Sequence, residues 1–271
     1  MKIFLGPAGI PVTAKGSSTK DGIKSVAELG LNAMEIEFVR GVHMGIPLAK
    51  EAGKVAKDEG ILLSIHAPYY INLCNPEKVE ASKKRILDSC ERAHHLGAWV
   101  VVFHPGYYGN AKERAFNLVL EACHEMNDRI KASGWDVKLG LETTGKTAQF
   151  GTLDENIAIH HKIKNCIPAV DFSHIFARNV GKIDFAEVLE KMEALGLAHH
   201  HCHFSGIEYT AKGERNHVTL DHKKPDFGLL TKSLLKTGMK NITIISESPV
   251  LEQDSLKMRN ILEGAGYPWK R

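Results

Sequence analysis

The chain has 271 residues, of which 43% are hydrophobic and 25% are charged, and this length suits one α/β barrel of about 250 residues. Its 35 basic and 32 acidic residues give a net charge of +3, a balance that permits a polyanionic partner without indicating one. The five cysteines are dispersed and form no C-x-x-C pair, which excludes a disulfide framework and favours a cytoplasmic protein.

The apolar pattern predicts no membrane partner. The first residues, MKIFLGPAG, hold an apolar run far too short for a signal peptide, and it breaks at once into Gly-Pro. The longest apolar runs, such as AWVVVF at 98–103, have the length of a strand and not of a membrane-spanning helix.

In chain order, short β-rich runs alternate with helical patterns. The predicted strands are 2–7, 33–39, 62–68, 99–106, 137–144, 166–173, 199–206 and 242–249. Several of them are near-continuous apolar runs rich in Val and Ile, as expected of parallel strands buried on both faces. The predicted helices are 46–60, 76–97, 111–133, 154–165, 183–196, 226–238 and 252–263.

This alternation predicts a (β/α)₈ TIM barrel, an α/β fold that occupies residues 1–271 as a single domain. An open doubly wound sheet is the structural alternative. The lack of a G-x-G-x-x-G motif after the first strand disfavours it.

Six consecutive predicted strands end in a residue that can bind a metal ion. In chain order these residues are His66, His104, Glu142, Asp171, His203 and Glu247. His174 and His217 follow closely after the sixth and seventh strands. Because the carboxyl ends of barrel strands meet on the face that carries active sites, we expect these side chains to converge.

Each residue alone has an ordinary interpretation, as a hydrogen-bonded structural histidine or as a helix cap. Convergence changes this, because each uncompensated buried charge costs several kcal/mol and cations provide the compensation. Imidazoles and carboxylates without thiolates suit Zn²⁺, Mn²⁺ or Fe²⁺. Eight ligands exceed the needs of one tetrahedral ion and predict two or three. Such a cluster favours phosphate-ester hydrolysis.

Two pairs of tyrosines follow His66 and His104 directly, Tyr69-Tyr70 and Tyr107-Tyr108. Aromatic pairs beside a metal site can stack on nucleic-acid bases, and they can equally pack within their loops. Both interpretations remain open at this point.

The segment HHHCHFSG at 199–206 holds four histidines, but side chains alternate along a strand. His199, His201 and His203 are therefore expected on one face, and His200 on the other. Only His203 is predicted to reach the mouth of the barrel, with His201 as its hydrogen-bonding partner. His199 and His200 are predicted to pack near the start of the strand.

The motifs HAPYYINL (66–73), VFHPG (102–106), LETT (141–144), VDFSH (170–174), HFSG (203–206) and ESP (247–249) resemble the endonuclease IV family of apurinic/apyrimidinic endonucleases. They occur in order from the third to the eighth predicted strand. The resemblance implies a TIM barrel with three zinc ions. It also implies hydrolysis of the phosphodiester 5′ to an abasic site in duplex DNA by a metal-bound hydroxide.

The resemblance also implies residue roles. His66, His104 and Glu142 would hold one zinc ion, and Glu142 would bridge to a second ion near Asp171, His203 and Glu247. His174 and His217 would hold the third. Glu142 or Glu247 would orient or deprotonate the attacking water, and the sequence leaves this choice open. Tyr69 and Tyr70 match the loop that enters the duplex, and Arg40 is a further candidate DNA contact.

One position departs from the family pattern. The family has Asp-x-His after the seventh strand, whereas GERNHVTL places Arg215 where that aspartate would stand. Glu214 precedes it by one residue. Either Glu214 replaces the missing ligand, or the third zinc ion is held more weakly.

Sugar isomerases and epimerases similar to xylose isomerase are the competing interpretation. They hold a single divalent metal with Glu, Asp, His and Glu, a set that Glu142, Asp171, His203 and Glu247 would supply. An epimerase needs no further imidazoles, and this chain has four at the mouth, so the sequence favours the nuclease. We expect duplex DNA with abasic or damaged sites as the partner, and a monomer.

Overall fold

The structure is a computed structural model that describes residues 1–109 and 112–270. Eight parallel strands form its central sheet in the order β1-β12-β9-β8-β6-β4-β3-β2. Their bounds are β1 (Lys2–Pro7), β2 (Ala33–Glu37), β3 (Leu62–His66), β4 (Val100–Phe103), β6 (Lys138–Glu142), β8 (Cys166–Asp171), β9 (His200–Phe204) and β12 (Asn241–Ser246). The predicted (β/α)₈ barrel is therefore confirmed.

The barrel closes where β1 meets β2. An isolated parallel bridge joins Ala8 to Glu35, and the backbone N–H of Gly9 donates to the carbonyl of Glu35 at 2.9 Å. Gly6 permits this approach, because a Cβ atom there would lie 1.6 Å from the carbonyl oxygen of Ala33. The seam thus brings the start of the chain against β2 and fixes where Glu35 stands.

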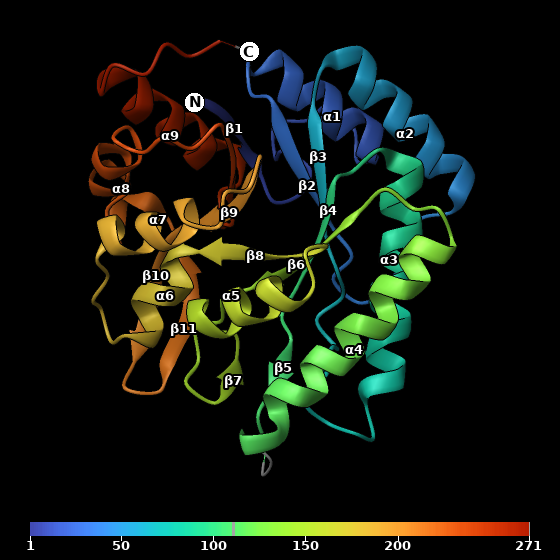
Figure 1. The fold of residues 1–271 in the computed structure, drawn as a ribbon. Helices are drawn as coiled ribbons and strands as arrows, with labels where there is room; N and C mark the ends of the chain where they lie inside the picture. Colours follow the sequence, from blue (N-terminus) through green and yellow to red (C-terminus); the bar gives the residue numbers. More distant parts are fainter. Residues whose placement is uncertain (110–111, 271) are drawn as a thin grey trace.

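The helices cover the outside of the barrel (Figure 1). Their bounds are α1 (Thr19–Glu28), α2 (Ile46–Glu59), α3 (Val79–Leu96), α4 (Lys112–Ala132), α5 (Leu153–Lys162), α6 (Phe172–Arg178), α7 (Phe185–Glu193), α8 (Phe227–Leu234) and α9 (Glu252–Gly264). The predicted helix 111–133 begins at residue 111, which lies outside the described residues. None of the described helices is long and apolar enough to cross a membrane.

Two helices were missed from the sequence. Helix α1 carries a capping box in which Ser18 and Asp21 bond to each other's backbone N–H, a signal that the sequence does contain. Helix α6 begins within the predicted strand 166–173, at Phe172, and continues to Arg178. Its N-cap is Asp171, whose side chain accepts a hydrogen bond from the backbone N–H of His174 at 2.8 Å. This cap ends β8 at Asp171 and turns His174 back toward the mouth.

Two small antiparallel pairs were also missed. Strands β5 (Gly106–Tyr107) and β7 (Gln149–Phe150) pair with each other, and β10 (Gly206–Thr210) pairs with β11 (Gly213–Val218). Both pairs lie at the lower end of the molecule in Figure 1, and the two termini lie at the upper end. The predicted strands 99–106 and 199–206 are therefore too long, since each runs on into the first strand of such a pair.

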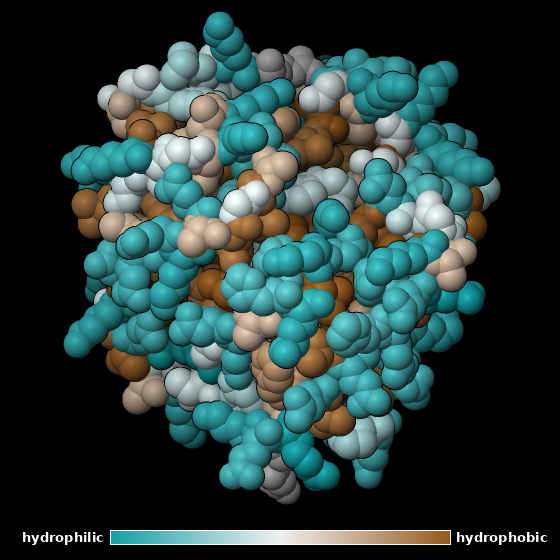
Figure 2. Space-filling view, in the orientation of Figure 1, coloured by the Kyte–Doolittle hydropathy of each residue, from teal (hydrophilic) through white to brown (hydrophobic). Residues whose placement is uncertain are grey.

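Strand β4 shows how the barrel separates its layers. Val101 and Phe103 join the large hydrophobic cluster that includes residues of the helices, whereas Val100 and Val102 pack in a smaller cluster with Ile167. All four β4 side chains are fully buried. This explains the continuous valine run, because both faces of the strand are covered. The face of the molecule in Figure 2 is mostly hydrophilic, with scattered apolar side chains.

Candidate metal centre

The metal-competent residues singled out in the sequence lie together at the carboxyl ends of the strands. His66, Glu142 and Asp171 are the last residues of β3, β6 and β8. The others lie one residue before a strand end, directly after one, or on the elements that follow. These are His203 on β9, His104 after β4, Glu247 after β12, His174 on α6 and His217 on β11.

Glu142 lies at the centre of this arrangement and is fully buried. Its Oε2 atom lies 2.6 Å from Nε2 of His104 and 3.1 Å from Nε2 of His66. Its Oε1 atom lies 3.0 Å from Nδ1 of His203 and 3.4 Å from Nδ1 of His174. Each carboxylate oxygen of Glu142 therefore faces two imidazoles.

The two glutamates of the centre have opposite electrostatic environments. Burial disfavours the charge on Glu142, but His104 and His203 overcome this and hold the pKa of its carboxyl well below its usual range. For Glu247 burial dominates and raises the pKa of the carboxyl well above its usual range. Environments that move two acids apart in this way are typical of sites with distinct acid–base roles.

The donor atoms form groups that fit metal ions. Three sets in the mouth have one ligand atom from each member within 4.8 Å of the others: His66, His104 and Glu142; His174, His217 and Glu247; and Glu142, Asp171, His174 and Glu247. Oδ2 of Asp171 and Nε2 of His174 are buried and have no hydrogen-bond partner among the described residues. Buried polar atoms without a hydrogen bond are rare in proteins, and cations would satisfy these two.

A cavity of about 490 Å³ opens above these groups. His66, His104, His174, His217 and Glu247 line it. Glu142, Asp171 and His203 lie deeper, with exposed fractions of 0%, 0% and 1%. The centre therefore has a buried layer of ligands and an outer layer that a substrate can reach.

Tyrosines stand at the rim of the cavity. Tyr69 is 61% exposed and Tyr107 is 47% exposed, and both line the cavity. Tyr108 is buried, and its hydroxyl donates to the Glu155 carboxylate at 2.7 Å, so it packs against α5 and not at the rim. Tyr70 and Arg40 are exposed and lie outside the lining of the cavity.

A bulge in β11 explains the departure at Arg215. Tyr209 pairs with Glu214 and Glu208 pairs with Asn216, which leaves Arg215 as an extra residue. In a regular strand two residues three apart face opposite sides, but the extra residue lets Glu214 and His217 both line the cavity.

The side chains on either side of this bulge point in different directions. Oε2 of Glu214 lies 3.6 Å from Nε2 of His174. The side chain of Arg215 is exposed and lines a separate surface depression. Glu214, and not Arg215, thus stands where an additional ligand would be needed.

Two acidic residues of the site were missed from the sequence, Glu35 and Glu37 of β2. The alternation in AMEIE at 33–37 places both on one face of the strand, a signal that the sequence does contain. Glu37 lines the cavity, and burial raises the pKa of its carboxyl to about 7. Glu35 lies deeper and is fully buried.

His199, His201 and His203 have different neighbours in the barrel. Nε2 of His201 lies 3.2 Å from Nε2 of His203, so the two rings share the barrel interior. The ring of His199 stacks on Trp99 at a centroid distance of 4.4 Å and hydrogen-bonds with Thr243. Of these histidines, His203 contacts the carboxylates of the mouth, at 3.0 Å from Glu142.

The chain is similar in sequence to an uncharacterized protein and to probable endonucleases. An uncharacterized protein of Methanocaldococcus jannaschii is 39% identical over 268 residues, and the alignment covers 94% of each chain. A probable endonuclease 4 of Mycoplasma mobile is 28% identical over 208 residues, which cover 73% of this chain and 72% of that protein.

Solved structures share the fold. A D-tagatose 3-epimerase-like protein superposes with a TM-score of 0.73 at 22% identity, covering 97% of this chain and 96% of its own. Endonuclease IV from Thermus thermophilus has a TM-score of 0.73 at 19% identity, covering 97% and 98%. The resemblance to endonuclease IV is thus confirmed among the relatives. Since a family model also matches residues 23–264, the chain belongs to the xylose isomerase-like TIM barrel family.

Proposed function

We propose that this protein is an apurinic/apyrimidinic endonuclease that hydrolyses the phosphodiester 5′ to abasic sites in duplex DNA, with three zinc ions as its cofactor. The observation that carries the proposal is the presence of His66, His104, His174 and His217 around one cavity. These imidazoles come in addition to the ligands that a single-metal enzyme of this family would need.

The first ligand set is one of the clusters described above, and the other two combine those clusters with the roles that the resemblance to endonuclease IV implies. His66, His104 and Glu142 would hold the first ion. Asp171 and His203 would hold the second, together with Glu142 and Glu247. His174, His217 and Glu214 would hold the third. When bound, the ions would act as Lewis acids on the phosphodiester and lower the pKa of a water molecule.

Among the two glutamates, we assign the acid–base role to Glu247. Each oxygen of Glu142 already faces imidazoles at 3.4 Å or less, and the side chain has an exposed fraction of 0%. The side chain of Glu247 is 15% exposed and lines the cavity, so it can reach a water molecule beside the substrate. Glu142 would then serve as a metal ligand, and Glu247 would accept or orient a proton of the attacking water.

The rim supports a nucleic-acid substrate. Tyr69 and Tyr107 present exposed rings at the cavity, where base stacking stabilises a duplex opened at a lesion. Lys146 lines the same cavity and supplies a positive charge for a phosphate. Tyr70 and Arg40 are exposed beyond the cavity, so we assign them to the flanking duplex and not to the lesion itself.

The second candidate is a single-metal sugar isomerase or epimerase. Glu142, Asp171, His203 and Glu247 match the ligand types of that class, and a D-tagatose 3-epimerase-like structure shares the fold. In such an enzyme His66 and His104 would have no metal to bind, although both face a carboxylate oxygen of Glu142.

The test combines metal content with incision. Protein purified without chelator is analysed for zinc and incubated with a duplex that carries one abasic-site analogue. We expect more than two zinc ions per chain and cleavage on the 5′ side of the lesion. An otherwise identical undamaged duplex serves as the control. One metal per chain together with turnover of a ketose would overturn the proposal in favour of the epimerase.

A further inference from the structure

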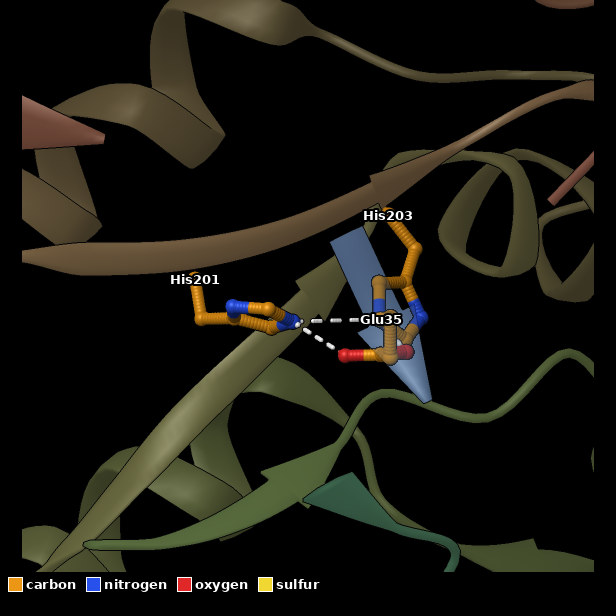
Figure 3. Close-up of side chains that lie close together, drawn as sticks. All are labelled: Glu35, His201 and His203. Atoms are coloured by element: carbon orange, nitrogen blue, oxygen red, sulfur yellow. Dashed lines mark hydrogen bonds and ion pairs between the residues drawn. The ribbon is translucent and has the colours of Figure 1, made fainter. Parts of the chain in front are cut away.

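A second polar cluster lies in the barrel beneath the mouth, formed by Glu35, His201 and His203 (Figure 3). Their side chains have exposed fractions of 0%, 0% and 1%. Oε2 of Glu35 lies 2.9 Å from Nε2 of His201, and Oε1 lies 2.9 Å from Nε2 of His203. A carboxylate this deeply buried is costly unless charged and hydrogen-bonding neighbours compensate it.

The orientation of the imidazole rings distinguishes His203 from other rings of the site. In His66 and His217 Nδ1 contacts a backbone carbonyl or a hydroxyl, and Nε2 is turned toward a carboxylate of the mouth. In His174 Nδ1 contacts the backbone carbonyl of Thr143 at 2.9 Å and also lies 3.4 Å from Glu142 and from Asp171. His203 is reversed, because its Nδ1 faces Glu142 at 3.0 Å and Glu247 at 3.3 Å while its Nε2 faces Glu35.

We propose that Glu35 is a positioning residue that holds Nε2 of His203 and thereby presents Nδ1 of that ring to the metal centre. This inference rests on the metal centre of the proposed function. A carboxylate can only accept hydrogen bonds, so the ring nitrogen opposite it carries the proton and the other nitrogen is free to bind a cation. Such a partner also increases the basicity of the ligand.

The surroundings of Glu35 fix its carboxylate for this task. Its Oε2 atom accepts from Oγ of Ser64 at 2.7 Å and from Nε2 of His201 at 2.9 Å. Its Oε1 atom makes no hydrogen bond among the described residues and faces Nε2 of His203 in an ion-pair contact at 2.9 Å. Ser64 on β3 and His201 on β9 thus hold the group from both sides.

An ion within the cluster itself is the other interpretation of these three side chains. It would require His203 to bind one ion through each ring nitrogen, and therefore to lose both ring protons. The positioning role requires only the ordinary neutral imidazole, and for this reason we favour it. The two interpretations differ in the number of ions that the protein loses when Glu35 is changed.

The test compares Glu35→Gln with Glu121→Gln, the same substitution at an exposed glutamate of α4, away from the site. We expect Glu35→Gln to lower zinc affinity by about 10–100-fold in a competition titration. We also expect it to change the ¹⁵N NMR signals of the His203 ring, which a general loss of stability would not alter selectively. Glu121→Gln should leave those ring signals unchanged. If Glu35→Gln does not fold, Ser64→Ala is used, with a smaller effect in the same direction.

Each outcome decides the inference. Unchanged zinc affinity and unchanged His203 signals in Glu35→Gln would overturn it. Loss of one whole zinc ion per chain at saturating zinc, with the His203 signals preserved, would overturn it in favour of an ion in the cluster. Both readouts are independent of DNA cleavage. A protein that binds zinc through His203 as inferred but does not incise abasic DNA would refute only the proposed function.

Discussion

At the scale of single residues, the candidate metal centre is organised around the carboxylate of Glu142, which four imidazoles face. Glu142 faces His66 and His104 with one oxygen and His174 and His203 with the other. Such sharing suits a bridging ligand, since each oxygen can serve a separate ion. His104 is the most exposed of these imidazoles, with 29% of its side chain accessible, so it contributes to the site and little to the core.

His104 therefore separates function from folding. We expect His104→Ala to reduce incision of an abasic duplex by at least about 100-fold, because a metal ligand contributes at least as much as its outer partners do. The thermal unfolding midpoint of the zinc-free protein should change little. His161→Ala, an exposed histidine on α5, is the matched control and should retain full activity. A His104→Ala protein that fails to fold would show instead that the residue is structural.

At the scale of elements, the β10–β11 hairpin adds two side chains to the cavity, Glu214 and His217, that do not come from the ends of the barrel strands. The family motif places two ligands two residues apart, which a regular strand presents on one face. Here the separation from Glu214 to His217 is three, and the bulge at Arg215 compensates for it. Glu214, which lines the cavity, therefore stands one residue before the position where the family motif has its aspartate.

This difference gives a direct prediction for Glu214 and Arg215. Glu214→Ala should weaken the most loosely held zinc ion by about 10-fold or more, whereas Arg215→Ala should leave zinc binding unchanged. The reason is that Glu214 faces His174 across the cavity and Arg215 points to the surface. Zinc competition titrations of the two variants measure this. Equal effects of the two substitutions would contradict the assignment of Glu214 as a ligand.

At the scale of the whole molecule, the barrel gathers buried carboxylates from several strands into one interior. Glu35, Glu142 and Asp171 are fully buried, and Glu247 lies beside them. Without cations, imidazoles must balance these charges. We infer that bound metal stabilises the folded chain as well as serving the reaction, because the unfolded chain cannot assemble the same ligands.

Removal of zinc should therefore lower the thermal stability of the whole barrel. An ion present at 100 times its dissociation constant contributes about 2.7 kcal/mol. In a chain of this size that corresponds to a shift of about 5–10 °C in the unfolding midpoint. Scanning calorimetry before and after EDTA treatment measures the shift, and added zinc should reverse it. An unchanged midpoint in protein shown to be free of zinc would contradict the prediction.

The sequence by itself determined the barrel and the main candidates for its metal site. Strand–helix alternation is a local property, and a barrel brings every strand end to one face, so His66, Glu142 and Asp171 could be singled out without coordinates. Their roles as ligands remain predictions. The capping box of α1 and the AMEIE alternation on β2 are equally present in the sequence.

Only the tertiary structure decided which side chains meet across the barrel. Glu35 and His201 are 166 residues apart, and no local pattern encodes their contact. The reversed ring of His203 depends on that contact. The bulge at Arg215 depends on the pairing of β10 with β11. Periodicity specifies which face of a strand a residue occupies, whereas closure of the barrel and strand pairing specify what that face contacts.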